Sequence, residues 1–225
     1  MHRYQIHCRN VLERDLYSKI LSKNPFTLPK LESITLHISF LGKNKAPLNT
    51  RRFFLPAYLA LELITGQKPK IIEAKESVAN LSLREGDFCA LSVKLRKGAM
   101  YQFLDSLVNI VLPSMGSVDT LLDTSFDNQG NFSMKIPNLL YFPQLEKEYQ
   151  HFHPMSSGAV GTSSTGGGKD GDFTSYLPVE ISFALKHLPT PLGYKSESSE
   201  GKNPQASLEA SKLFLKSLHL PYPQK

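Results

Sequence analysis

Several segments of the chain alternate apolar and polar residues with a period of two. Residues 33–40, 88–96, 132–136 and 177–185 follow this pattern. In the first of them, four apolar side chains fall on one face and three polar ones on the other: Ile34, Leu36, Ile38 and Phe40 against Thr35, His37 and Ser39. Such alternation is typical of a strand that is buried on one side only. A short strand is also expected at 70–73.

Helical spacing of apolar residues separates these strands. It predicts helices at about 5–22, 52–65, 100–112 and 204–218. In the second helix, Phe54, Tyr58 and Leu61 form an apolar stripe that Leu55, Leu59 and Leu63 should widen. Gly66 and Pro113 are expected to stop the second and third helices, and Asn203-Pro204 to start the last one. Residues 127–130 (Asp-Asn-Gln-Gly) should form a turn.

This order of elements predicts an α+β fold, an RRM-like sandwich. Its antiparallel sheet would have helices packed on one face and an open face that binds RNA. Residues 1–225 are expected to form a single domain with flexible insertions at about 151–175 and 187–203. Within the first insertion, residues 156–172 consist mostly of Gly, Ser and Thr and cannot bury enough apolar surface to offset their ordering entropy. The second insertion is polar and contains Pro, Gly and Ser.

Positive charge is concentrated in the first hundred residues. Of the 26 Lys and Arg, 17 lie there against 8 acidic residues, and all seven arginines are among them. Residues 101–225 have a net charge of −3. Because arginine and lysine neutralise phosphates, a polyanion such as RNA should bind mainly through the N-terminal half. A plain solvated basic surface is the alternative on charge alone.

The sequence gives little support to a membrane protein, a disulfide-rich protein, a metal site or an enzyme. No run of 18 apolar residues occurs, so no membrane span is expected, and Cys8 and Cys89 are too few for a disulfide framework. The run 166–169 (Gly-Gly-Gly-Lys) lacks the remaining residues of a phosphate-binding loop. A metal site at His151 and His153 is not favoured in a Gly/Ser-rich setting. We therefore expect no enzyme activity, no metal and no cofactor; a catalytic role for His37 or His151 is the weakest alternative.

Residues 63–69 read Leu-Ile-Thr-Gly-Gln-Lys-Pro. This run resembles the hallmark of the L5 family of large-subunit ribosomal proteins. Further similar blocks follow in the same order, at 74–79, 83–86, 93–96, 100–104, 125–133 and 142–143, and the chain ends similarly with 220–223 (Leu-Pro-Tyr-Pro). The resemblance covers most of the chain outside the two insertions.

The resemblance implies a structural role in the central protuberance of the large ribosomal subunit. Family members bind 5S rRNA and large-subunit rRNA on the sheet face, which implies rRNA contacts at His37, Gln67, Lys68, Lys94 and Arg96. The loop at 75–86 would contact P-site tRNA through Lys75, Ser77, Asn80 and Arg84. The segment after the central helix, 114–120, would meet a small-subunit head protein in an intersubunit bridge. Other central-protuberance proteins are implied neighbours, and a membrane is not.

Departures from the family pattern point to an organelle. The family has an asparagine where His37 stands, and the bridge segment 114–120 lacks the family's arginines and carries Asp119. Residues 1–24 contain Glu13 and Asp15, which transit peptides avoid, so a mature first helix is expected there. Together with the insertions, this drift suggests a mitochondrial ribosome, with a plastid or bacterial cytoplasm less favoured. A free-standing RNA-binding module outside the ribosome is the alternative function.

Overall fold

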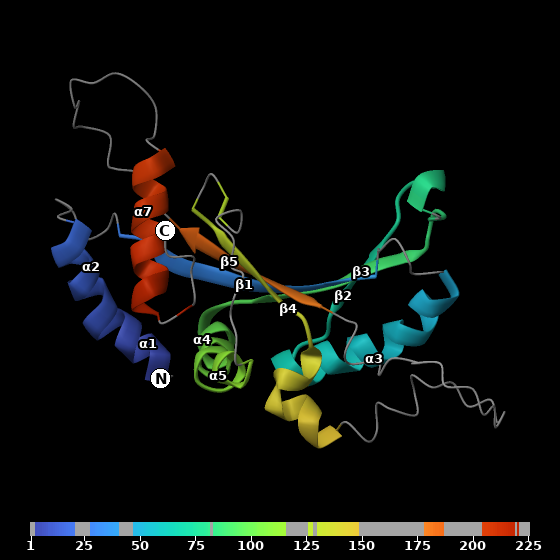
Figure 1. Ribbon diagram of the computed structural model, residues 1–225, viewed down its shortest axis with the longest axis horizontal. Helices are drawn as coiled ribbons and strands as arrows, with labels where there is room; N and C mark the ends of the chain where they lie inside the picture. The colour runs from blue at the N-terminus through green and yellow to red at the C-terminus, as the bar shows by residue number, and fades with distance from the viewer. Residues whose placement is uncertain are drawn as a thin grey trace. The chain divides into compact units, whose positions relative to one another are not determined.

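A computed structural model of the chain describes residues 3–20, 28–40, 47–81, 83–115, 126–127, 130–148, 178–186, 204–218 and 220 (Figure 1). Five strands form one antiparallel sheet in the order β2-β3-β1-β5-β4. The strands are β1 (Lys30–Ser39), β2 (Lys70–Glu73), β3 (Phe88–Leu95), β4 (Phe132–Ile136) and β5 (Val179–Lys186). Together with the helices, they confirm the α+β class.

Two of the helical stretches contain a π-helical segment. The first consists of α1 (Arg3–His7), the π segment η1 (Cys8–Leu12) and α2 (Glu13–Ile20). The central one consists of α4 (Lys97–Ser106), the π segment η4 (Leu107–Val111) and α5 (Leu112–Ser114). The others are α3 (Pro47–Thr65), α7 (Pro204–Ser217), the 3₁₀ turns η3 (Ala79–Leu81) and η6 (Leu139–Tyr141), and a short helix at 143–148.

The chain divides into two compact units. Unit 1 comprises Met1–Ile34, Leu95–Met134 and Ser182–Lys225, and unit 2 comprises Thr35–Lys94 and Lys135–Ile181. In unit 1, α4 lies on one side of the strands, as α3 does in unit 2 (Figure 1). The single domain with two insertions stays a prediction, because both insertions, 151–175 and 187–203, lie outside the described residues.

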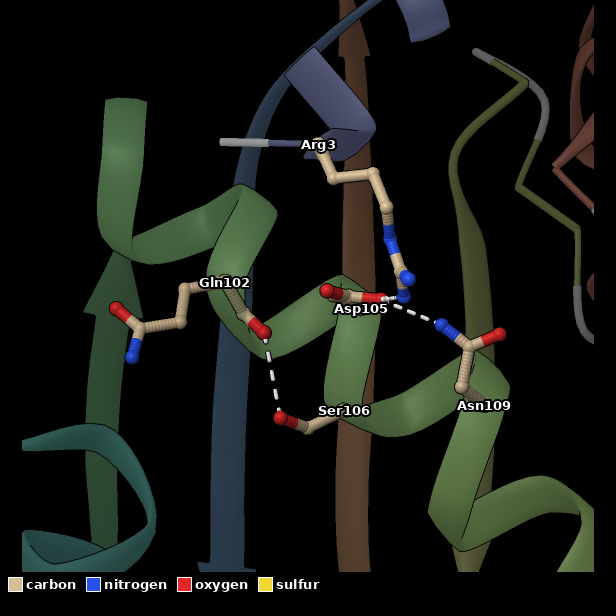
Figure 2. A network of polar contacts seen from close by, with 5 residues as sticks. All are labelled: Arg3, Gln102, Asp105, Ser106 and Asn109. Carbon is tan, nitrogen blue, oxygen red and sulfur yellow. Dashed lines mark hydrogen bonds and ion pairs between the residues drawn. The ribbon is translucent and has the colours of Figure 1, made fainter. Parts of the chain in front are cut away.

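Unit 1 is held together by helix packing and by one polar network. Helix α1 packs against α4, and α2 packs against α7. Figure 2 shows Arg3 of α1 donating to the Asp105 carboxylate of α4 at 2.5 Å, while Asn109 donates to the same oxygen. The hydrogen bond to Asp105 raises the pKa of Arg3. This network joins the start of the first helix to the middle of the central one.

Unit 2 has an aromatic cluster between its helix and its strands. The Phe54 ring of α3 stacks on Phe88 of β3, with centroids 4.5 Å apart, and lies 6.0 Å from Phe40, next to the end of β1. On the same helix, Ala57, Ala60 and Leu61 are almost fully buried. Small alanines on this face allow the helix to approach the sheet closely, which fixes the position of the strands against it.

Most predicted elements are confirmed, with boundaries shifted by a few residues. Strands 70–73 and 132–136 agree with β2 and β4, and the last helix begins at Pro204 as expected. At the expected turn, the Gly130 N–H donates to the Asp127 carbonyl at 2.8 Å, and residues 128–129 between them lie outside the described residues. Strand β1 begins three residues before the expected position, and the adjacent Ser33 and Ile34, both buried, interrupt the alternation between its start and the rest of the strand.

Three expectations about the helices were wrong. Helix α3 begins at Pro47 instead of residue 52, with a proline at its first position, where the missing N–H costs nothing. Leu55 and Leu63 do not widen its buried stripe but are 53% and 45% exposed, because Ala57 and Ala60 occupy the buried face. Pro113 does not stop the central helix, which continues to Ser114, since Pro113 begins a new turn after the π segment.

Candidate nucleic-acid interface

The open face of unit 2 begins with the polar side chains of β1 and β3. A hydrogen bond from the Phe40 N–H to the Cys89 carbonyl, 2.9 Å long, joins the two strands. Continuing this antiparallel register brings His37 to the level of Ser92. Both side chains are half-buried, whereas the residues on the other face, such as Leu36 and Leu91, are fully buried. The predicted open polar face is therefore present.

Strand β2 adds positive charge to this face. Lys70 pairs directly with Ser92 in the antiparallel register of β2 and β3. Opposite residues of an antiparallel pair share a face, so Lys70, Ser92 and Lys94 lie on the same side. Lys68 lies just before β2, two residues from Lys70. Of the predicted site, the strand pairing places His37 and Lys94 on one face, and Lys70 joins them there.

Sequence reasoning missed Lys70. The residue lies in a short strand without visible alternation, and all four side chains of β2 are exposed. Its face becomes evident only from its pairing with Ser92. A sequence signal did exist, because Lys68 and Lys70 are two residues apart and therefore point to the same side of an extended chain.

A tight turn positions Gln67 and Lys68. Gly66 ends α3 with a left-handed φ of 65°, and the Thr65 hydroxyl donates to the Leu61 carbonyl at 2.7 Å. The Gln67 N–H donates back to the same hydroxyl at 3.2 Å. Gln67 and Lys68 are exposed and Pro69 is buried. The Gly-Gln-Lys-Pro motif therefore presents an amide and an ammonium group just before β2.

Arg96 belongs to unit 1, where it stands at the start of the central helix. It is the N-cap residue of α4, with extended backbone at φ −140° and ψ 162°, and its side chain is exposed. The next residue, Lys97, has a φ of 53°. A left-handed conformation costs a residue with a side chain about 1–2 kcal/mol. This backbone turn leads the chain from β3 into the central helix with two cations at the junction.

The open face carries several cations that the described carboxylates leave unneutralised. Within the described residues, Lys68, Lys70 and Lys94 take part in no ion pair. Like charges that face one another across a sheet are mildly destabilising. A bound anion such as a phosphate would relieve this repulsion.

The connection between β2 and β3 is a hydrogen-bonded arm, residues 74–87, which projects beyond both strands (Figure 1). At its base, the Ala74 N–H donates to the Asp87 carbonyl at 2.9 Å and the Gly86 N–H donates to the Ala74 carbonyl at 3.0 Å. Further out, Val78 and Leu83 form an isolated β-bridge. The described part of the arm, which excludes Ser82, is therefore held in shape by its own backbone.

The four predicted tRNA-contact residues differ in their surroundings. Ser77 accepts a hydrogen bond from the Glu85 N–H at 3.0 Å, so its hydroxyl helps to hold the arm together. Lys75, Asn80 and Arg84 have exposed side chains. The arm places these three groups on a stable support from which they can contact a partner.

Some of the other candidate residues lie outside the described part of the chain. These are residues 116–120 of the bridge segment, and also His151 and His153. Among the residues that are described, no three His, Cys, Asp or Glu side chains gather in a way that could hold a metal ion. No helix in the same part of the chain is both long and apolar enough to span a membrane.

Comparison with known proteins identifies the class. The family model for the C-terminus of the ribosomal L5 family matches residues 88–165. The large ribosomal subunit protein uL5m of Reclinomonas americana is 34% identical over 153 residues, which span 68% of this chain and 82% of the relative. The uL5 proteins of Vesicomyosocius okutanii and Clostridium kluyveri are 36% and 40% identical, over 66% and 58% of this chain and 80% and 70% of their own lengths.

The fold and these similarities define a ribosomal protein. The chain belongs to the L5 family of large ribosomal subunit proteins. Its role is structural and not enzymatic. Family membership favours a place in the ribosome over a free-standing RNA-binding module.

Proposed function

We propose that the chain binds 5S rRNA, large-subunit rRNA or both in the central protuberance of the large subunit. The observation that supports this proposal is the pairing of Lys70 with Ser92, which adds Lys70 to the open face of Lys94 and His37. Lysines neutralise phosphates, while hydroxyl and imidazole groups between them can hydrogen-bond phosphate and ribose oxygens. Gln67 would extend this contact from the neighbouring turn, and Arg96 would be a separate rRNA contact in unit 1.

A salt titration of RNA binding tests the proposal. Replacing Lys94 and Arg96 together with Ala should lower the affinity for 5S rRNA and reduce the slope of log K against log salt by about 2, one per phosphate contact. Lys147→Ala is the matched control, because Lys147 is an exposed lysine on the helix at 143–148. Unchanged affinity and slope in the double variant would contradict the proposal.

The arm at 74–87 is proposed to contact P-site tRNA. Lys75, Asn80 and Arg84 are the contact groups, and Ser77 keeps the arm in shape. A photocrosslinker at residue 80 should capture tRNA on ribosomes with an occupied P site. A crosslinker at residue 147 serves as the control. No tRNA product at residue 80 on tRNA-filled ribosomes would count against this assignment.

Residues 114–120 are proposed to meet a small-subunit head protein. The segment contains Asp119 and no Lys or Arg, so it cannot neutralise phosphates. We expect a contact with protein through small polar groups and through Leu121 and Leu122, with little dependence on salt. A ribosome structure with rRNA phosphates hydrogen-bonded to several side chains of 114–120 would overturn this.

The ribosome in question is proposed to be mitochondrial. The similarity to the uL5m protein of Reclinomonas americana supports this, although bacterial uL5 proteins are similarly close. Sucrose-gradient sedimentation of a mitochondrial lysate should recover the chain in stoichiometric amounts with the large subunit. Recovery of the chain only in plastid or cytoplasmic ribosomes would refute the mitochondrial assignment but not the ribosomal role.

A further inference from the structure

Strand β2 forms one edge of the sheet that the described residues build. Its four residues, Lys70–Glu73, are all exposed. The backbone groups of an edge strand that point away from the sheet can pair with another extended chain. Since Lys70–Glu73 are exposed on both sides of the strand, this edge is accessible to such a chain.

Two exposed isoleucines flank the free edge on opposite faces. Ile71 pairs with Leu91 and shares its face, whereas Ile72 pairs with Ala90. Ile71 is 39% exposed and Ile72 37%. A helix or an RNA strand placed against one face would cover one isoleucine only. An extended peptide added to the edge would cover both, because its own side chains alternate between the faces.

The ends of the strand carry opposite charges. β2 reads Lys-Ile-Ile-Glu, with Lys70 and Glu73 at its two ends. We propose that the β2 edge binds an extended segment of a neighbouring protein in the large subunit, one that pairs an acidic residue with Lys70, apolar residues with Ile71 and Ile72, and a basic residue with Glu73. The proposal rests on the ribosomal role of the chain and adds a protein partner to its RNA contacts.

A second copy of the chain fits this edge less well. If a two-fold axis joined the β2 strands of two copies edge to edge, every side chain would stay on the same face of the combined sheet. In the antiparallel pair, one residue would then have to lie opposite the same residue of the other copy, and the pair would be centred on that residue. Centred on Ile71, the pair would bring Lys70 opposite Ile72 of the other copy. Centred on Ile72, it would bring Ile71 opposite Glu73. Either arrangement leaves the charges without opposite partners, so charge complementarity favours a different chain.

A partner can pair with only a few residues of the β2 edge. The register of β2 and β3 shifts between Ile72 and Glu73, which marks a β-bulge or similar irregularity. Short strands, edge lysines and bulges are devices that limit indiscriminate pairing. The edge therefore suits a partner that other contacts in the ribosome already hold nearby, because its effective concentration is then high.

Photocrosslinking in assembled large subunits tests the proposal. Benzoylphenylalanine is introduced at residue 71 or 72, or at residue 63 of α3 as a control of similar exposure. The variants are incorporated into ribosomes, and the crosslinked products are identified by mass spectrometry. Both edge positions should crosslink to the same segment of one other protein, and residue 63 should not. Glu73→Lys, which leaves the lysines of the open face unchanged, should remove most of the product, and an opposite charge reversal in the captured segment should restore it.

The outcomes separate this inference from the proposed role. If the chain sediments with the large subunit but residues 71 and 72 crosslink to RNA, to different proteins, to a second copy or to nothing, the edge proposal is wrong and the ribosomal role stands. If the chain does not sediment with the large subunit at all, the ribosomal role fails first. Slower amide exchange in β2 within the subunit than in the free chain is a second expected result.

Discussion

Phe54 of α3 stacks on Phe88 of β3, with ring centroids 4.5 Å apart and planes 24° from parallel. The pair joins the helix of unit 2 to the strand that carries Ser92 and Lys94. Aromatic pairs of this kind add about 0.5–1.5 kcal/mol beyond the burial of their area. The stability of the helix–sheet contact and the shape of the proposed RNA-binding face therefore depend on the same two rings.

Phe54→Ala should destabilise the protein by about 2–4 kcal/mol, because loss of the half-buried ring leaves a cavity beside Phe88 and Phe40. Leu55→Ala is the matched control. Leu55 is the next residue and is 53% exposed, so its truncation should change stability by about 0.5 kcal/mol or less. Urea denaturation measures both. Equal losses for the two variants would disprove the packing role of Phe54.

Lys70→Ala should weaken RNA binding and lower the salt slope by about 1, as expected for one lost phosphate contact. The reason is its place opposite Ser92 on the open face. Filter binding at several salt concentrations measures the change, with Lys147→Ala as the control. A slope equal to that of the unmodified protein would exclude Lys70 from the contact.

Ser77→Ala should loosen the arm, because the Glu85 N–H loses the hydroxyl that accepts its hydrogen bond. We expect faster hydrogen exchange at the Glu85 amide in the free protein. Asn80→Ala should leave this exchange unchanged but reduce tRNA crosslinking. If both variants had the same exchange rates as the unmodified chain, the proposed support by Ser77 would be disproved.

Cys8 should make stability fall at alkaline pH. Burial, followed by the nearby charge of Glu13, raises the pKa of its thiol to about 11 from an ordinary value of 9.0. Between these values the unfolded chain loses the thiol proton first, so the unfolded state binds fewer protons and unfolding becomes easier as pH rises. Below the unfolded pKa this contribution is fully present. In Cys8→Ala, stability should depend less on pH between these two pKa values. Urea denaturation midpoints at several pH values measure this dependence.

Gly66→Ala should destabilise the end of α3 by about 1 kcal/mol through its left-handed backbone alone. The φ of Gly66 is 65°, and no atom lies within 4 Å of the position that an added Cβ would take. Gly66→Asn should cost less, since asparagine tolerates this conformation. Thermal unfolding of the two variants provides the comparison. A larger loss for Asn than for Ala would contradict a purely conformational cause.

Period-two alternation made the strands predictable, because burial on one face selects apolar residues at every second position. The same principle failed at β2, where no residue is buried and Lys70 could be placed only through its partner Ser92. Helix α3 begins at Pro47, five residues before the expected start, and it contains Pro56 in its interior, where a proline is ordinarily unfavourable. The sequence also indicated Lys94 and Arg96 as neighbouring cations. It did not indicate that Lys94 belongs to unit 2 and Arg96 to unit 1.

The two π segments have a consequence for how this chain can differ in length from its relatives. The Glu13 N–H bonds to the Cys8 carbonyl and the Leu112 N–H to that of Leu107, five residues back in each case. A π turn is equivalent to one extra residue accommodated within an α-helix. Loss of a single residue from either segment would convert it to regular α-helix. Within these two segments, a relative that is one residue shorter can therefore keep a continuous helix.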